Sequence, residues 1–123
     1  MARFILVVDD DRDIRDSLIE LLEDHGYPAR GAGNGVEAID VLRAEPAPPC
    51  LILLDLMMPV MDGRGFREAQ LREPAWAGIP VIVISAYGDV DTQAGALALE
   101  FLKKPLTTRP LMAAVERRCG PAV

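Results

Sequence analysis

The sequence predicts an α/β fold of the type (βα)5, in which five parallel strands alternate with five helices that cover both faces of a sheet. Three runs, residues 4–8, 51–54 and 81–84, are apolar at every position and contain β-branched residues. Strands with this pattern are buried on both faces, which is typical of a parallel sheet. Segments with helical periodicity separate these runs. At 123 residues the chain, residues 1–123, is expected to form a single domain.

The position of one proline predicts the strand order. Asp11 is suited to cap a first helix over residues 12–25, and Gly26 stands just past its end. The second strand, expected over residues 27–32, contains Pro28. Proline has no backbone N–H to donate, so this strand belongs at an edge of the sheet. A doubly wound sheet in the order 2-1-3-4-5 satisfies that requirement.

The second half of the chain continues the alternation. Asn34 and Glu37 have the spacing of a capping box at the start of a second helix. A third helix is expected over about residues 65–72, and Asp62-Gly63 before it is most simply a turn. The remaining expected elements are a weak fourth helix over residues 91–97, a fifth strand over 101–103 and a fifth helix from 108 to about 120.

Three acidic residues follow two neighbouring strands of the predicted sheet. Asp9 and Asp10 end the first strand, and Asp55 ends the third, inside a run that is otherwise apolar. An unpartnered carboxylate inside a core is costly, so we expect Asp55 to open onto a crevice and not to be buried. Three converging carboxylates repel one another, and a hard dication such as Mg²⁺ relieves the repulsion.

Two further polar residues follow the outer strands. Ser85 ends the fourth strand and offers a hydroxyl, whereas Lys104 follows the fifth and offers an ammonium group. Ligands of open α/β sheets bind beyond the carboxyl ends of the strands. Carboxylates, a metal, a hydroxyl and a cation at that position are suited to binding a phosphoryl group.

Composition limits the partners and the compartment. The formal net charge of −6 argues against direct binding to nucleic acid. The longest N-terminal apolar run, residues 4–8, is too short for a signal peptide or a membrane span. We therefore expect a cytoplasmic protein without a membrane partner. Cys50 and Cys119 fit no metal-binding spacing and are expected to be reduced thiols.

These motifs resemble the receiver domain of two-component response regulators, the CheY-like family, which has a flavodoxin-like fold. The matching pieces are Val7-Val8-Asp9-Asp10, the run from Leu53 to Gly63, Val83-Ile84-Ser85-Ala86 and Lys104-Pro105. Each piece alone is weak, but the four together, in order and with nearly the expected spacing, are specific. The segment between Ser85 and Lys104 is about one helical turn shorter than is usual in the family, so we expect a short or displaced fourth helix.

The resemblance implies a role for each of these residues. Asp55 is the expected phosphoacceptor, and Lys104 and Ser85 are expected to bind the phosphoryl group. The metal ligands are expected to be Asp9, Asp10, Asp55 and the backbone carbonyl of Met57. Ser85 and Phe101 are expected to form the conformational switch, although Phe101 also suits a simple core position.

The resemblance also implies partners. The phosphoryl donor is expected to be a sensor histidine kinase or a histidine phosphotransfer protein, and Mg²⁺ the cofactor. The receiver of the signal is expected to be an effector protein or an output domain that this chain lacks, with a homodimer possible. Such a domain catalyses only its own phosphorylation and slow dephosphorylation, so we do not expect an enzyme acting on other substrates.

Three other function classes can be weighed from the sequence. A degenerate receiver that binds a partner without phosphorylation remains an alternative, although such domains usually lose an acid or the lysine and none is lost here. Phosphatases with an aspartate nucleophile need a second aspartate two positions later, where this chain has Met57. Nucleotide-binding enzymes need a glycine-rich phosphate loop after a strand, and the sequence contains neither common form of it.

Overall fold

In the part of the chain that the computed structural model describes, residues 3–56, 58–85, 100–103 and 106–122, five parallel strands form the middle layer. They lie in the order β2-β1-β3-β4-β5, as predicted. The strands are β1 (Ile5–Val8), β2 (Ala29–Ala32), β3 (Leu51–Asp55), β4 (Val81–Ser85) and β5 (Glu100–Lys103). The predicted flavodoxin-like arrangement is therefore confirmed.

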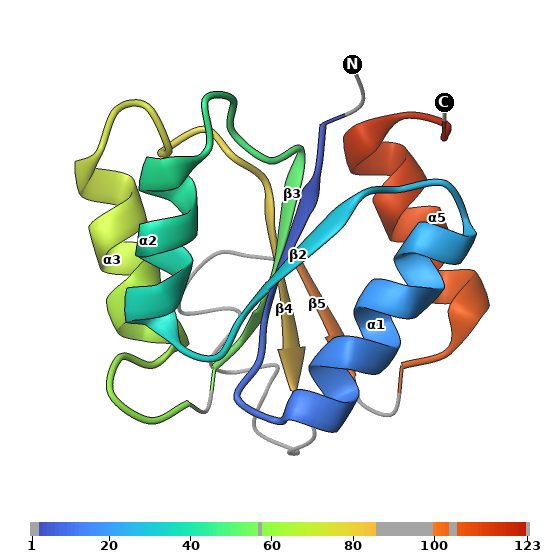
Figure 1. Cartoon of the computed structure of the whole chain (residues 1–123), viewed down its shortest axis with the longest axis horizontal. Coiled ribbons are helices and arrows are strands. Elements are labelled where there is room, and N and C mark those ends of the chain that lie inside the picture. The colour runs from blue at the N-terminus through green and yellow to red at the C-terminus, as the bar shows by residue number, and fades with distance from the viewer. Residues whose placement is uncertain (1–2, 57, 86–99, 104–105, 123) are drawn as a thin grey trace.

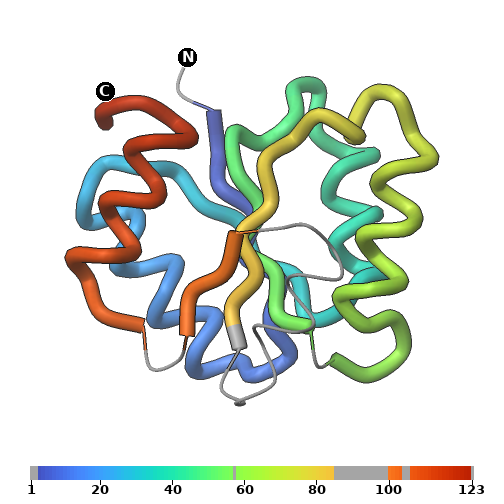
Figure 2. Tube along the Cα trace, turned by 180° about the vertical axis from the view of Figure 1, so that it is seen from behind, coloured from blue at the N-terminus to red at the C-terminus, as the bar shows by residue number. Residues whose placement is uncertain are grey.

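The described helices form the two outer layers. Helices α1 (Arg12–Asp24) and α5 (Thr108–Cys119) cover one face of the sheet, and α2 (Gly35–Ala44) and α3 (Gly63–Arg72) cover the other (Figure 1). The view from behind shows the same two layers on either side of the strands (Figure 2). The fourth helix expected over residues 91–97 lies outside the described residues.

Alternate residues of the central strands build two separate cores. Ile5 and Val7 of β1 pack on the side of α1 and α5, while Leu6 and Val8 pack on the side of α2 and α3. Strand β3 divides its residues in the same way. Every residue of these two strands is buried, which explains why all of them except Asp55 are apolar.

Polar side chains cap three of the helices. Asp11 accepts hydrogen bonds from the backbone N–H groups of Asp13 and Ile14, so its predicted capping role is confirmed. Asp62 accepts one from the N–H of Gly65, at 2.9 Å, and α3 consequently begins at Gly63. The interpretation of Asp62-Gly63 as a turn was therefore wrong, because this pair caps and opens the helix.

The second helix begins with the predicted capping box in a slightly extended form. The side-chain oxygen of Asn34 accepts a hydrogen bond from the N–H of Glu37 at 2.9 Å. The carboxylate of Glu37 reaches back past Asn34 to accept one from the N–H of Gly33, also at 2.9 Å. Together these bonds satisfy donors that a helix start otherwise leaves unpaired.

Strand β2 lies at the edge of the sheet, as Pro28 required. The strand is shorter than expected, because it begins at Ala29, immediately after the proline. The carbonyl of Pro28 still accepts a hydrogen bond from the N–H of Ile5 at 2.8 Å. The prediction of an edge strand is confirmed, and only its first residues were assigned wrongly.

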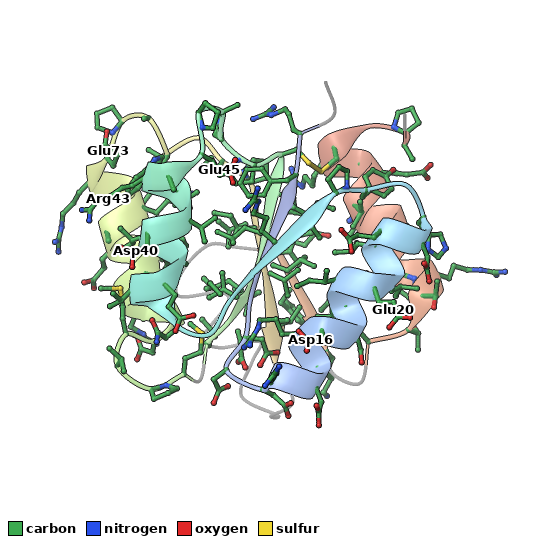
Figure 3. The ribbon with its side chains drawn as sticks, viewed as in Figure 1. Asp16, Glu20, Asp40, Arg43, Glu45 and Glu73 are labelled. Carbon is green, nitrogen blue, oxygen red and sulfur yellow. A yellow bond between two sulfur atoms is a disulfide. The ribbon has the colours of Figure 1, made fainter. Side chains whose placement is uncertain are left out.

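The two cysteines form a disulfide, so the expectation of reduced thiols was wrong. Cys50 and Cys119 are 69 positions apart in the sequence, but their Cα atoms are 5.3 Å apart. The bond joins the residue before β3 to the last residue of α5 (Figure 3). Cysteine spacing alone cannot reveal this pairing, because the crossover connections of the parallel sheet bring the two residues together.

The outer faces of the helices are polar. Asp16 and Glu20 project from α1, and Asp40 projects from α2 (Figure 3). All three residues are exposed, which is typical of amphipathic helices on a covered sheet. Among the described helices, none has the length and apolar character that crossing a membrane requires.

Candidate functional site

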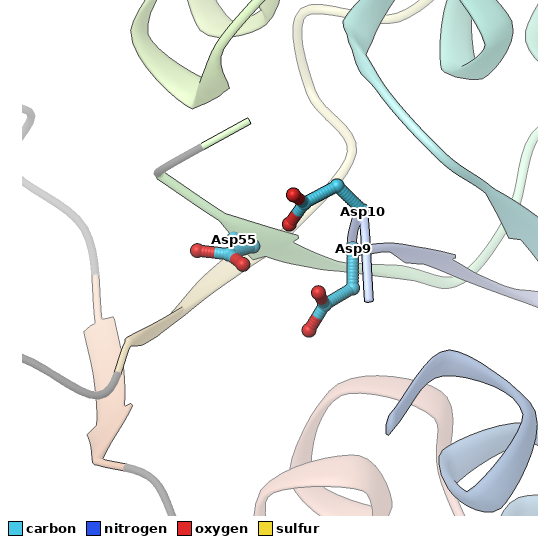
Figure 4. A group of neighbouring side chains, drawn as sticks. All are labelled: Asp9, Asp10 and Asp55. Carbon is cyan, nitrogen blue, oxygen red and sulfur yellow. The ribbon is translucent and has the colours of Figure 1, made fainter. Parts of the chain in front are cut away.

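Asp9, Asp10 and Asp55 meet at the carboxyl ends of the two central strands. Strands β1 and β3 pair in register, with Val8 opposite Leu54, so Asp9 and Asp55 occupy the next positions on adjacent strands. One oxygen atom can be chosen from each of the three carboxylates so that all lie within 4.8 Å of one another (Figure 4). The structure therefore brings together the three acids that the sequence singled out.

The three acids differ in exposure. Asp9 is fully buried, Asp55 is 6% exposed, and Asp10 is exposed. The expectation that Asp55 would not be buried was wrong. Asp55 still lies within the β-ladder, where it pairs with Ile84 of β4, whereas the pairing of β3 with β1 ends one position earlier, at Leu54 and Val8. A buried carboxylate beside a second one is an environment in which a bound cation is strongly favoured.

Three hydrogen bonds to other described residues help to hold Asp9 in place. Its backbone N–H donates to the carbonyl of Ala32 on β2, at 3.0 Å, which extends the β-ladder by one residue. Its Oδ1 accepts from the N–H of Asp11 at 3.0 Å, which closes the turn into α1. Its backbone carbonyl accepts from Nη1 of Arg15 at 2.8 Å. The turn that carries Asp9 and Asp10 is thus tied to both β2 and α1.

Gly63, the first residue of α3, lies against the backbone of Asp55. A methyl group added at Gly63 would lie 2.7 Å from the carbonyl oxygen of Asp55 and 2.8 Å from Cα of Leu56. The N–H of Gly63 also donates to the carbonyl of Leu56 at 3.1 Å. The helix therefore touches the strand end that carries Asp55, and only glycine permits that approach.

Sequence reasoning missed the roles of Arg15 and Gly63 in holding this site. Gly63 stood in the motif but was interpreted as a turn residue, and Arg15 fell on the polar side of the first helix pattern. The available signal was that Gly63 directly follows Asp62, a residue type that commonly caps a helix, which could have indicated that a helix begins there. Nothing in the sequence alone indicated which backbone group Arg15 contacts.

The other predicted site residues are only partly described. The backbone of Ser85 ends β4 and pairs with Lys103, the last residue of β5, so both strands end at the same edge as the acids. Met57, Lys104 and the side chain of Ser85 lie outside the described residues. Phe101 is on β5 and is 38% exposed.

The donor set suits a hard divalent cation. Carboxylate oxygens are the ligands that Mg²⁺ prefers, and Mg²⁺ commonly uses one or two carboxylates together with retained water. Two buried carboxylates and one exposed carboxylate provide such ligands here. Within the described part of the chain, this is the one group of three or more acidic, histidine or cysteine residues placed to hold a metal.

Known proteins with similar sequences are response regulators. Response regulator MprA of Mycobacterium bovis is 37% identical over 127 residues, which covers 98% of this chain and 54% of MprA. An NtrX-like response regulator of Rickettsia bellii is 31% identical over 119 residues, which covers 94% of this chain and 24% of the relative. The chain thus spans about half or less of the length of these relatives.

Solved structures with the same fold point in the same direction. Chemotaxis protein CheY4 of Vibrio cholerae has a TM-score of 0.83 at 25% identity, covering 96% of this chain and 99% of that protein. The receiver domain of a signal transduction histidine kinase from Syntrophus aciditrophicus has a TM-score of 0.84 at 30% identity, and the match covers 96% of this chain and 90% of that one. The family model for the response regulator receiver domain matches residues 5–116. By sequence and by fold, this chain belongs to the receiver domain family of response regulators.

Proposed function

We propose that Asp55 accepts a phosphoryl group and that the resulting aspartyl phosphate switches the conformation of the domain. The observation that carries this proposal is the convergence of Asp9, Asp10 and Asp55, with carboxylate oxygens within 4.8 Å, at the carboxyl edge of the sheet. Ligands of doubly wound sheets bind at this edge, between the strands where the order reverses. Strands β1 and β3 are those strands.

The proposed donor is a phosphohistidine on a sensor histidine kinase or a histidine phosphotransfer protein. A carboxylate oxygen of Asp55 attacks phosphorus, a P–O bond forms as the P–N bond breaks, and the imidazole nitrogen keeps the electron pair of that bond while the ring takes up a proton from water and leaves as neutral imidazole. Asp9, Asp10 and Asp55 would hold Mg²⁺, together with the carbonyl of Met57. The ion supplies positive charge that offsets the negative charge of the phosphoryl oxygens.

The remaining roles rest on the motifs of the sequence. Lys104 and Ser85 are proposed to bind phosphoryl oxygens, and Ser85 and Phe101 to form the switch. The signal would pass to an effector protein or to an output domain. The domain acts on itself and is not proposed to turn over an external substrate. We place it in the cytoplasm, without direct contacts to nucleic acid or membrane.

The test is incubation with acetyl phosphate and Mg²⁺, followed by mass spectrometry of the intact protein. The parent should gain the mass of one phosphoryl group, and Asp55→Asn should gain none. Asp40→Asn is a matched control, because it makes the same change on the outer face of α2, and it should be labelled like the parent.

Two results would contradict the proposal. Labelling of Asp55→Asn at another acid would show that Asp55 is not the acceptor. A parent that remains unlabelled by acetyl phosphate and by several histidine kinases, while still binding a partner, would favour a phosphorylation-independent binding module.

A further inference from the structure

Arg15 joins the first helix to the turn that carries the acids. It is half-buried on α1, and its Nη1 donates to the backbone carbonyl of Asp9 at 2.8 Å. The same residue is bonded at its own N–H to the carbonyl of Asp11, at 2.9 Å. Arg15 therefore contacts the turn between β1 and α1 at both of its ends.

The path of this side chain runs across β2, and a glycine makes that path possible. A methyl group at Gly31 would lie 3.0 Å from Cδ and 3.2 Å from Cγ of Arg15, and 2.9 Å from Cδ1 of Ile19. Gly31 lies in the strand and pairs with Val7. Its φ is outside the left-handed region, so the backbone does not require glycine here. The space that the Arg15 and Ile19 side chains occupy favours glycine instead.

The guanidinium end of the Arg15 side chain lies close to a second glycine, Gly33. A methyl group at Gly33 would lie 3.5 Å from Nη1 of Arg15 and 3.3 Å from Oε1 of Glu37. Glu37 is itself held by the capping box of α2. The guanidinium group is therefore confined between β2, the start of α2 and the Asp9 carbonyl that it contacts.

The Asp10 carboxylate depends on this turn for its position. Within the described part of the chain, no hydrogen bond or ion pair to the Asp10 side chain is present, although its oxygen lies within 4.8 Å of those of Asp9 and Asp55. The peptide between Asp9 and Asp10 is fixed through the Asp9 carbonyl. A contact to that carbonyl consequently sets the direction in which Asp10 leaves the backbone.

We propose that Arg15 is a positioning residue for the metal site, which acts through the Asp9–Asp10 peptide and depends on the space left by Gly31. This inference rests on the proposed function, because it assumes that the three acids bind Mg²⁺. Residues that orient metal ligands from behind typically contribute 10- to 100-fold to metal affinity.

The direction in which Mg²⁺ affinity changes when Arg15 is replaced distinguishes a positioning role from an effect of its charge. Arg15 is a cation near a cation site, so its charge alone weakens Mg²⁺ binding, and removing that charge should tighten binding. Loss of the contact to Asp9 has the opposite effect, because the carboxylates are then no longer held in one geometry. We expect the loss of positioning to be the larger of the two.

The experiment measures the dissociation constant of Mg²⁺ by isothermal titration, without any phosphoryl donor, in the parent and in matched variants. Arg15→Gln should bind Mg²⁺ about 10-fold more weakly than the parent. Arg12→Gln is the matched control, because it removes the same charge from an exposed position on the same helix turn, where Arg12 forms an ion pair with Asp16 at 3.7 Å. It should bind Mg²⁺ as the parent does, or slightly more tightly.

A second variant displaces Arg15 and leaves its charge in place. Gly31→Val puts a residue suited to strands where the Arg15 side chain passes, and it should also weaken Mg²⁺ binding several-fold. Because both changes disturb one contact, the double variant should lose little more than Arg15→Gln alone. Thermal unfolding in EDTA identifies any variant that has lost its fold. If either Arg15→Gln or Gly31→Val is unfolded, the Mg²⁺ affinity of the other tests the proposal.

The outcomes distinguish this proposal from the proposed function. A parent that binds no Mg²⁺, or that binds it equally well after Asp10→Asn, contradicts the metal site itself. If the parent binds through Asp10, the positioning role is overturned when Arg15→Gln or Gly31→Val binds Mg²⁺ at least as tightly as the parent. It is also overturned when the two losses multiply in full in the double variant.

Discussion

The two ends of the sheet are built on opposite physical principles. At the carboxyl edge, defined here by Asp9, Asp10 and Asp55, like charges are brought within 4.8 Å and held by backbone contacts. At the amino edge, defined by the Cys50–Cys119 disulfide and by Tyr27, the chain is fastened covalently and by hydrogen bonds. The hydroxyl of Tyr27 donates to the carbonyl of Gly120 at 2.8 Å, beside the disulfide.

The contacts at the amino edge stabilise the folded state, whereas the clustered charges at the carboxyl edge destabilise it. Like charges in close proximity destabilise the folded state unless a cation is present. Covalent and hydrogen-bonded contacts at the other edge can offset that cost without touching the site. Changes at the amino edge should therefore alter stability and leave Mg²⁺ binding intact, whereas changes at the carboxyl edge should alter both.

The largest expected effect is at the amino edge. Reducing the disulfide should lower the free energy of unfolding by about 4 kcal/mol, because the bond closes a long loop, 69 positions in sequence, in the unfolded chain. Urea denaturation with and without dithiothreitol measures this change. The Cys50→Ala, Cys119→Ala double variant should show no response to the reductant. An unfolding midpoint of the parent that reductant leaves unchanged would contradict the prediction.

Measuring Mg²⁺ binding before and after reduction tests whether the two edges are independent. The reduced parent, measured at a temperature where it is still folded, should bind Mg²⁺ within about twofold of the oxidised parent, since the disulfide contacts none of the acids. A large loss of affinity on reduction would show that the two edges are energetically coupled.

The second effect concerns the connection from α3 into the amino end of β4. Gln70 is fully buried, and its Nε2 donates to the carbonyls of Trp76 and Ile79 at 2.9 and 3.1 Å. Gln70→Ala should lower the free energy of unfolding by about 3 kcal/mol, because it leaves two carbonyls without this donor and opens a cavity. Glu68→Ala, on the exposed side of the same helix, should change it by less than about 0.5 kcal/mol. Equal effects in the two variants would show that the buried hydrogen bonds of Gln70 do not stabilise this connection.

The third effect moves to the carboxyl edge. Gly63→Ala should destabilise the fold by about 2 kcal/mol, because the new methyl group meets the Asp55 carbonyl at 2.7 Å and the backbone cannot easily yield. Because Asp55 itself shifts, Mg²⁺ binding should weaken too. Gly78→Ala makes the same substitution where nothing lies within 4 Å, and it should be neutral in both measurements. A Gly63→Ala variant with parental Mg²⁺ affinity would show that Asp55 tolerates the displacement.

The sequence predicted one edge of the sheet far better than the other. The acids were found because they interrupt apolar runs at strand ends, and Pro28 identified the edge strand, so both the strand order and the acidic cluster followed from local patterns. The Cys50–Cys119 bond was predicted wrongly, because it depends on which strand start lies beside which helix end. The burial of Asp55 was missed for a related reason, since the residue that pairs with it in the sheet, Ile84 of β4, is distant in the sequence.

The smallest expected effect has the opposite sign. Asp10→Asn should raise the free energy of unfolding by about 1 kcal/mol in EDTA, since it removes one of three charges that lie within 4.8 Å of one another. Asp10 is exposed, so burial adds little and the gain should shrink in high salt. Mg²⁺ should stabilise the parent according to its concentration relative to Kd, and this response should be absent in Asp10→Asn. Asp40→Asn changes the net charge equally, away from the site, and should keep the parental response. A less stable Asp10→Asn protein in EDTA would mean that the carboxylate is satisfied without a metal, and the contrast between the two edges would then fail where it is most specific.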